Sequence, residues 1–350
     1  MNIICRFSVL SFVWALLLGS CSQNKDYVPM CHISDNYVES VPIDSLFHIY
    51  DVFELKVEAP PVVKKIMKCD SSVYVSDGKK LYVYNTGGSF LGIISKRGRG
   101  PGEYVDILDF DCSDNCIFII DRNGKLLKYS LDGECVAEKR TGWYPAAMCV
   151  FGNALILSSA CQTPGEKIKV LDKESLEEKS AFGRVSESEL TWRHFMNQQN
   201  FYQTSKEVLF HEPMSNTISS IDLDNRTMDV RYILDFINAV PDKVLNSRYS
   251  SVMDMNKAFL AGNYSAGTPV YVESERSILF SFRAGETYRM GRYDLVDKES
   301  IQFDAIKLNG NETSIPISSL GAYFYSDENS FLIISDGIAD RKLVMRVSLR

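Results

Sequence analysis

The sequence predicts an all-β protein, a six-bladed β-propeller with a short helical insertion around residues 235–263. Three observations support this fold class: strand-sized apolar runs along most of the chain, a repeat of these runs about every 45 residues, and one region of helical spacing. Short runs bounded by turn residues are typical of β-sheets, and repeats of roughly 40 to 50 residues with four short strands are typical of propeller blades.

The repeat is clearest in the first half of the chain. Val73–Tyr84 matches Ile117–Tyr129, and a glycine-containing hairpin follows each segment. Further copies lie at residues 167–172, 217–222, 289–294 and 332–347, which gives six units. Because blades pack face to face, both faces of each sheet are apolar, and this explains strands that are continuous apolar runs.

One region departs from this pattern. From Asp235 to Asn263 the apolar residues follow spacings nearer to helical than to alternating, so we expect one or two helices there. Residues 184–198 are a weaker helical candidate.

A ring of blades must be closed, because an open terminal blade exposes a sheet edge. We expect the strand-like segment at residues 47–57 to complete a blade with the last strand, residues 344–349. The chain is thereby divided into a signal peptide (residues 1–20), a tether (21–45) and a propeller (46–350).

The N-terminal residues have the three-part pattern of a secretory signal. Arg6 precedes the uncharged run Phe7–Leu18, and two small residues and Cys21 follow. Leu18–Cys21 resembles the lipobox of bacterial lipoproteins, in which the cysteine is lipidated and cleavage occurs just before it. The resemblance implies that acyl chains on Cys21 anchor the chain to a membrane. An ordinary cleaved signal and an N-terminal membrane helix are the alternatives, although the apolar run is short for a span.

The charge balance argues against one class of partner. The net charge is −7, and removing residues 1–20 leaves 37 basic against 45 acidic residues, a net charge of −8. Binding of nucleic acid requires a cluster of basic residues that contacts the phosphates, and the charge balance gives no sign of such a cluster. We expect the cell envelope as the location, with a lipid anchor in the outer membrane, a periplasmic or surface-facing domain, and an envelope protein or glycan as partner.

Seven cysteines remain without Cys5 and Cys21, so at least one is unpaired. Cys112 and Cys116 flank a turn-like triplet, and either form a disulfide across a hairpin or stay single buried thiols, the commoner fate. Cys-x₃-Cys lacks a second pair at zinc-finger spacing, and the four histidines are scattered. No cofactor is predicted, and the metal content stays open, with Ca²⁺ or Zn²⁺ in the central channel as the remaining option.

A glycine-rich string lies between the first two units: Arg97, Gly98, Arg99, Gly100, Pro101, Gly102, Glu103 and Tyr104. In one interpretation it is a ligand loop, whose backbone N–H groups and two arginines hold a phosphate or carboxylate. In the other it is a turn between blades, in which the glycines adopt positive φ, the proline stiffens the chain and the glutamate accepts hydrogen bonds from backbone donors. The string does not precede a helix and lacks the Lys-Ser/Thr of a P-loop, which favours the turn.

This string, the Asp-containing unit after it, the lipobox-like segment and the six-unit count together resemble the six-bladed β-propeller lipoproteins of gut anaerobes. Those proteins are related in architecture to NHL-repeat propellers and to the TolB propeller. The resemblance implies a fold and an address, and it supplies no catalytic residue.

Two classes of function follow. The first is a binding or scaffold module for a protein or glycan partner. The second is a propeller enzyme, a lyase or hydrolase with a metal or small ligand in the central channel. No Gly-x-Ser-x-Gly elbow is present, and the repeated Asp77, Asp121 and Asp336 are expected to end strands as turn residues rather than to ring the channel. The absence of repeated histidine clusters favours the first class.

Overall fold

The computed structural model describes the chain from residue 28 to residue 350 with gaps. The residues outside the description are 1–27, 57–58, 61, 114, 162–163, 186–189, 191–200, 205, 213, 309–313, 317–319, 322–325, 328–329 and 336–341. Cys21 and the signal segment therefore lie outside the described residues, as does most of the weaker helical candidate at 184–198.

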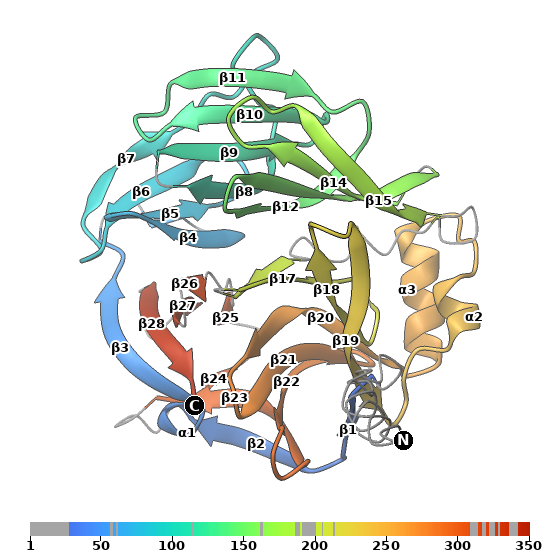
Figure 1. The fold of residues 1–350 in the computed structure, drawn as a ribbon. Coiled ribbons are helices and arrows are strands. Elements are labelled where there is room, and N and C mark those ends of the chain that lie inside the picture. The colour runs from blue at the N-terminus through green and yellow to red at the C-terminus, as the bar shows by residue number, and fades with distance from the viewer. Residues whose placement is uncertain are drawn as a thin grey trace, which may run out of the picture.

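Six β-sheets form a ring, as Figure 1 shows, and we number these blades in chain order. Blade 1 contains β4 (Lys65–Cys69), β5 (Ser72–Ser76), β6 (Leu81–Asn85) and β7 (Phe90–Ile94). Blade 2 contains β8 (Ile107–Ser113), β9 (Cys116–Asp121), β10 (Lys125–Ser130) and β11 (Cys135–Arg140). Blade 3 contains β12 (Pro145–Phe151), β13 (Ala154–Ser159), β14 (Gly165–Asp172) and β15 (Glu178–Val185).

The second half of the ring carries additional strands from the N-terminal part of the chain. Blade 4 contains β16 (Phe201–Gln203), β17 (Val208–His211), β18 (Thr217–Asp222), β19 (Thr227–Phe236) and β1 (Met30–Ile33). Blade 5 contains β20 (Ser265–Glu273), β21 (Ser277–Ala284), β22 (Thr287–Asp294), β23 (Ser300–Lys307), β24 (Ser314–Pro316) and β2 (Tyr37–Pro42). Blade 6 contains β25 (Leu320–Gly321), β26 (Ser326–Asp327), β27 (Ser330–Ser335), β28 (Leu343–Leu349) and β3 (Phe47–Glu54).

The predicted six-bladed propeller is confirmed, and each of the six repeat copies lies in a different blade. Packing explains why the strands read as continuous apolar runs. Six buried apolar clusters each lie between two consecutive sheets, so the middle strands are covered on both faces. Between blades 1 and 2, for example, Tyr74 packs in one cluster with Phe110 and Tyr129.

The ring closes as expected. In blade 6 the N-terminal strand β3 pairs antiparallel with the C-terminal strand β28, from Phe47 opposite Leu349 to Glu54 opposite Leu343. The segment expected to be a tether, residues 21–45, in contrast includes two strands that pair with the blades. β1 pairs parallel with β19, β2 pairs parallel with β23, and α1 (Ile43–Leu46) joins β2 to β3. These segments add outer strands to blades 4 and 5.

The helical insertion is also confirmed. It contains α2 (Asp242–Leu245) and α3 (Val252–Ala261), between blades 4 and 5 in the chain. The Ser251 side chain accepts a hydrogen bond from the Asp254 N–H and caps α3, which buries Met255 and Phe259 one turn apart. Within the described part of the chain, no helix is long and apolar enough to cross a membrane.

Cys112 and Cys116 lie on the two strands of the β8–β9 hairpin. Cys112 pairs across the β8–β9 hairpin with Ile117, whereas Cys116 pairs with Ser113, so the two side chains project from opposite faces of the sheet. A disulfide between them is therefore excluded, and the seven cysteines from Cys31 to Cys161 are all free thiols in this structure.

Candidate functional site

The glycine-rich loop joins β7, the outer strand of blade 1, to β8, the inner strand of blade 2. Tyr104 anchors the C-terminal end of the loop and is fully buried. Its backbone N–H donates to the Lys96 carbonyl (3.0 Å), its carbonyl accepts from the Gly98 N–H (2.9 Å), and its hydroxyl donates to the Ile94 carbonyl (3.2 Å). The ring packs edge-on against Tyr129, whose hydroxyl donates to the Gly102 carbonyl at 2.8 Å. The loop is thus a fixed part of the interface between the two blades.

The glycine N–H groups of this loop are occupied by protein acceptors. Besides the Gly98 bond, the Gly100 N–H donates to the Glu103 carboxylate (2.8 Å) and the Gly102 N–H to the Glu138 carboxylate (2.7 Å). Of the three glycines only Gly102 has positive φ, at 68°, and a Cβ on Gly98 would collide with the Glu103 carboxylate. These contacts are those of a turn, and the backbone presents no cradle for an anion.

Lys125 supports the loop from β10. Only 6% of the residue is exposed, and its ammonium donates to the carbonyls of Gly100 (2.8 Å) and Glu103 (2.7 Å) and contacts the Glu138 carboxylate at 3.3 Å. The hydrogen bond from the Gly102 N–H, with further contributions from Lys125 and Arg140, holds the pKa of Glu138 below its usual range against the opposing effect of burial. The positive charge of Lys125 is therefore largely satisfied within the protein.

Asp121 ends β9 and ties the following turn to the loop. One carboxylate oxygen accepts from the N–H groups of Asn123 (2.6 Å) and Lys125 (3.2 Å), and the other accepts from the Val105 N–H (3.1 Å). Asp77 caps the equivalent turn of blade 1 in the same way. Both are turn residues, as expected, and Asp336 lies outside the described residues.

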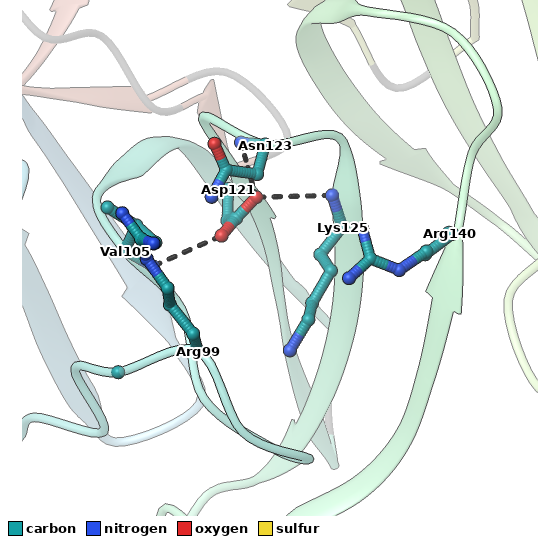
Figure 2. A pocket seen from close by; sticks show the side chains of 7 residues that line it. Arg99, Val105, Asp121, Asn123, Lys125 and Arg140 are labelled. Atoms are coloured by element: carbon teal, nitrogen blue, oxygen red, sulfur yellow. Dashed lines mark hydrogen bonds between the residues drawn. The ribbon is translucent and has the colours of Figure 1, made fainter.

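A pocket of about 280 Å³ lies between this loop and the end of blade 2. Its lining consists of Gly98, Arg99, Val105, Asp121, Asn123, Lys125 and Arg140. Figure 2 shows Arg99 and Arg140 on opposite sides of the pocket, with Asp121 and Asn123 between them in this view.

Two of the cations in this pocket are available to a ligand. Within the described part of the chain, neither the Arg99 nor the Arg140 guanidinium makes a hydrogen bond or an ion pair with another residue, and both residues are exposed. Arg97, in contrast, donates to the Val105 carbonyl (3.2 Å) and lies 3.5 Å from the Asp106 carboxylate. Each of these two guanidinium groups is a candidate ligand for an oxyanion, because arginine matches carboxylate and phosphate geometry.

Of the residues expected from the sequence, the loop supplies Gly98 and Arg99 to this pocket. Sequence reasoning missed Asn123, Lys125 and Arg140, which come from the β9–β10 turn and from the strands β10 and β11. A basic residue at the end of an outer strand carries no signal by itself, since its position depends on strand register.

A second polar group lies among the inner strands of three consecutive blades. The Lys65 ammonium on β4 contacts the Asp109 carboxylate on β8 at 2.8 Å. Asp109 and Asp111 accept hydrogen bonds from the N–H groups of Met148 and Val150 on β12, both at 2.8 Å. These charges are buried and internally satisfied, so they join blades 1, 2 and 3.

Among the residues that the structure describes, no group of three or more His, Cys, Asp or Glu side chains is placed to hold a metal ion. The residues around the pocket contain no nucleophile beside a base and no pair of free carboxylates.

The fold and this pocket define a six-bladed β-propeller with a basic pocket between blade 2 and the loop that joins it to blade 1. The chain belongs to the family described as "Domain of unknown function (DUF4934)", which matches residues 61–338. A comparison with curated proteins gives no match.

Three solved structures resemble this chain to different degrees. A protein of Bacteroides fragilis described as a "Putative exported protein" has a TM-score of 0.69 and 15% identity, over 92% of this chain and 99% of that one. BamB from Moraxella catarrhalis has a TM-score of 0.43 and 11% identity, over 89% of this chain and 96% of that one. The Neurospora crassa Pan2 WD40 domain has a TM-score of 0.42 and 11% identity, over 81% and 74%. The similarity to the Bacteroides fragilis protein shows the fold alone.

Proposed function

We propose that the protein is a lipid-anchored envelope propeller that acts as a binding or scaffold module for a protein or glycan partner carrying a carboxylate or another oxyanion. The observation that carries the proposal is the pocket lined by Arg99 and Arg140, two exposed guanidinium groups on a rigid support. An exposed cation pair held by a fixed scaffold suits recognition, because little ordering is required when the ligand binds.

The address in this proposal depends on the N-terminal segment. The pattern from Arg6 to Cys21 supports export and lipidation, and the exported-protein description of the Bacteroides fragilis relative agrees with export. We place the anchored domain at the outer membrane, on either its periplasmic or its outer side.

The residues of the pocket have different roles in this proposal. Arg99 and Arg140 hold the oxyanion from two sides, and the Asn123 carboxamide, which has no hydrogen bond within the described residues, contacts a neighbouring hydroxyl of the ligand. Lys125 and Asp121 hold the loop and the turn in place. The carboxylate of Asp121 also discriminates against a ligand that places its anion on that side.

A matched pair of sugars tests the proposal. We expect the purified protein to bind D-glucuronate and not D-glucose in isothermal titration calorimetry, with an affinity that falls as salt rises. Arg140→Gln should weaken binding about 10- to 100-fold, as is usual for loss of a hydrogen bond to a charged group. Arg122→Gln is the control, because that exposed arginine contacts Asp106 and lies outside the pocket lining. Equal binding of the two sugars, or equal loss in the two variants, would contradict the proposal.

A further inference from the structure

Two cysteines face one another across the interface between blades 1 and 2. Cys69 is the last residue of β4, the inner strand of blade 1, and Cys112 lies in β8, the inner strand of blade 2. Both side chains are buried, and they belong to one apolar cluster together with Tyr74 and Ile117. Neither cysteine is part of the pocket described above.

Reciprocal hydrogen bonds fix the relation between these thiols. The Cys69 Sγ donates to the Ser113 carbonyl at 2.9 Å, and the Cys112 Sγ lies 3.7 Å from the Lys68 carbonyl, to which it donates. Each thiol thus contacts the chain neighbour of the other cysteine. The neighbouring Cys69 thiol, ahead of burial, raises the pKa of Cys112 well above its usual range. The two thiols therefore lie next to each other.

The other thiol near this pair is less well placed. Cys116 lies beside Ser113 in the β8–β9 hairpin, and its side chain projects from the sheet face opposite to that of Cys112. Cys69 therefore has one adjacent cysteine, Cys112, and a more distant one, Cys116.

We propose that Cys69 and Cys112 form a disulfide that links blade 1 to blade 2 when the chain meets a low-molecular-weight disulfide. One cysteine thiolate attacks the small disulfide, which releases one small thiol and leaves a mixed disulfide on the protein. The second cysteine then attacks the protein sulfur, loses its proton and releases the second small thiol. The two cysteines are oxidised by two electrons, and the small disulfide is reduced to two thiols.

The link would join residues that are distant in sequence but adjacent in the ring. It closes a loop of about 44 residues that contains β5, β6, β7 and the glycine-rich loop, so it restricts the unfolded chain. Compartments outside the cytoplasm, to which the N-terminal signal points, favour such bonds. The inference is otherwise independent of the oxyanion pocket.

The test uses the full chain, purified in detergent under reducing conditions and then refolded with oxidised and reduced glutathione. The protein is alkylated with N-ethylmaleimide, unfolded, digested with trypsin without reduction and analysed by mass spectrometry. We expect the peptide of residues 69–79 joined to the peptide of residues 100–122, two hydrogens lighter than their sum. Because the second peptide contains both Cys112 and Cys116, the matched variants Cys112→Ala and Cys116→Ala decide between them.

The expected result is a link that persists in Cys116→Ala and disappears in Cys112→Ala. Dithiothreitol should also lower the thermal midpoint of the oxidised wild-type protein by several degrees and leave that of Cys112→Ala unchanged. Free alkylation of both Cys69 and Cys112 after refolding with glutathione would overturn the inference, as would a link that requires Cys116. The sugar titration is unaffected by either outcome, so the two proposals fail separately.

Discussion

Replacing Asp111 by asparagine should remove a pH-dependent loss of stability. Asp111 is 6% exposed, and burial, opposed by Lys65 and by the N–H groups of Val150 and Cys112, raises its pKa from 3.8 to about 6. Between these two values the folded chain binds more protons than the unfolded chain. The free energy of unfolding therefore falls as the pH rises through this window.

The size of the effect follows from the shift. A difference of about 2 pKa units corresponds to about 3 kcal/mol, since one unit is worth about 1.4 kcal/mol. Burial also raises the pKa of Asp109, and this contribution has the same sign and persists in Asp111→Asn. Lys65→Met should make the loss of stability with rising pH larger, because both carboxylates then lose their cation. At neutral pH, breaking such a buried contact costs about 3–5 kcal/mol.

Urea unfolding followed by circular dichroism at pH 4, 5, 6 and 7 measures these differences. We expect the wild type to lose about 3 kcal/mol more than Asp111→Asn between pH 4 and pH 7. Lys65→Met should lose more than the wild type over the same range. Parallel curves for wild type and Asp111→Asn would refute the reasoning, because they would mean that the carboxyl does not titrate in this window.

Three further variants test the support of the glycine-rich loop, each by its urea midpoint at pH 7. Lys125→Met should cost about 2–3 kcal/mol, because the carbonyls of Gly100 and Glu103 lose their buried donor, and an unchanged midpoint would contradict its role. Tyr129→Phe should cost about 1 kcal/mol through loss of the hydrogen bond to Gly102, and a larger loss would indicate altered packing instead. Gly102→Ala should cost about 1–2 kcal/mol, since φ is 68° there, and a neutral result would show that the turn relaxes.

The blade architecture could be predicted because it is written in local sequence. Each unit carries two apolar strands and a turn, and burial on both faces makes these strands conspicuous. The N-terminal edge strands carry no such signal. β2 is exposed at its first three residues, Tyr37–Glu39, and pairs through its backbone with a strand far along the chain, so its sequence looks like that of a tether.

Only part of the candidate pocket could be predicted from the sequence, for a related reason. The glycine string marks the loop and Arg99, but Arg140 reaches the same pocket because β10 and β11 pair with Lys125 opposite Arg140. The register between the two strands places these residues opposite one another, and no local sequence pattern predicts that register. Register also rules out a disulfide between Cys112 and Cys116, because the hairpin brings the two residues close but leaves their side chains on opposite faces of the sheet.

The N-terminal strands also determine how an anchor at Cys21 would hold the propeller. β1, β2 and β3 contact blades 4, 5 and 6 in turn, so the chain wraps half of the ring before blade 1 begins, as Figure 1 shows. If Cys21 carries a lipid, a pull on that lipid would act first on β1, and the ladder of β2 on blade 5 would protect the closing strand β3. The chain from Cys21 to Met30 spans at most about 30 Å when fully extended. A propeller tethered in this way would stay close to the membrane surface, and its partners would be restricted to molecules within reach of that surface.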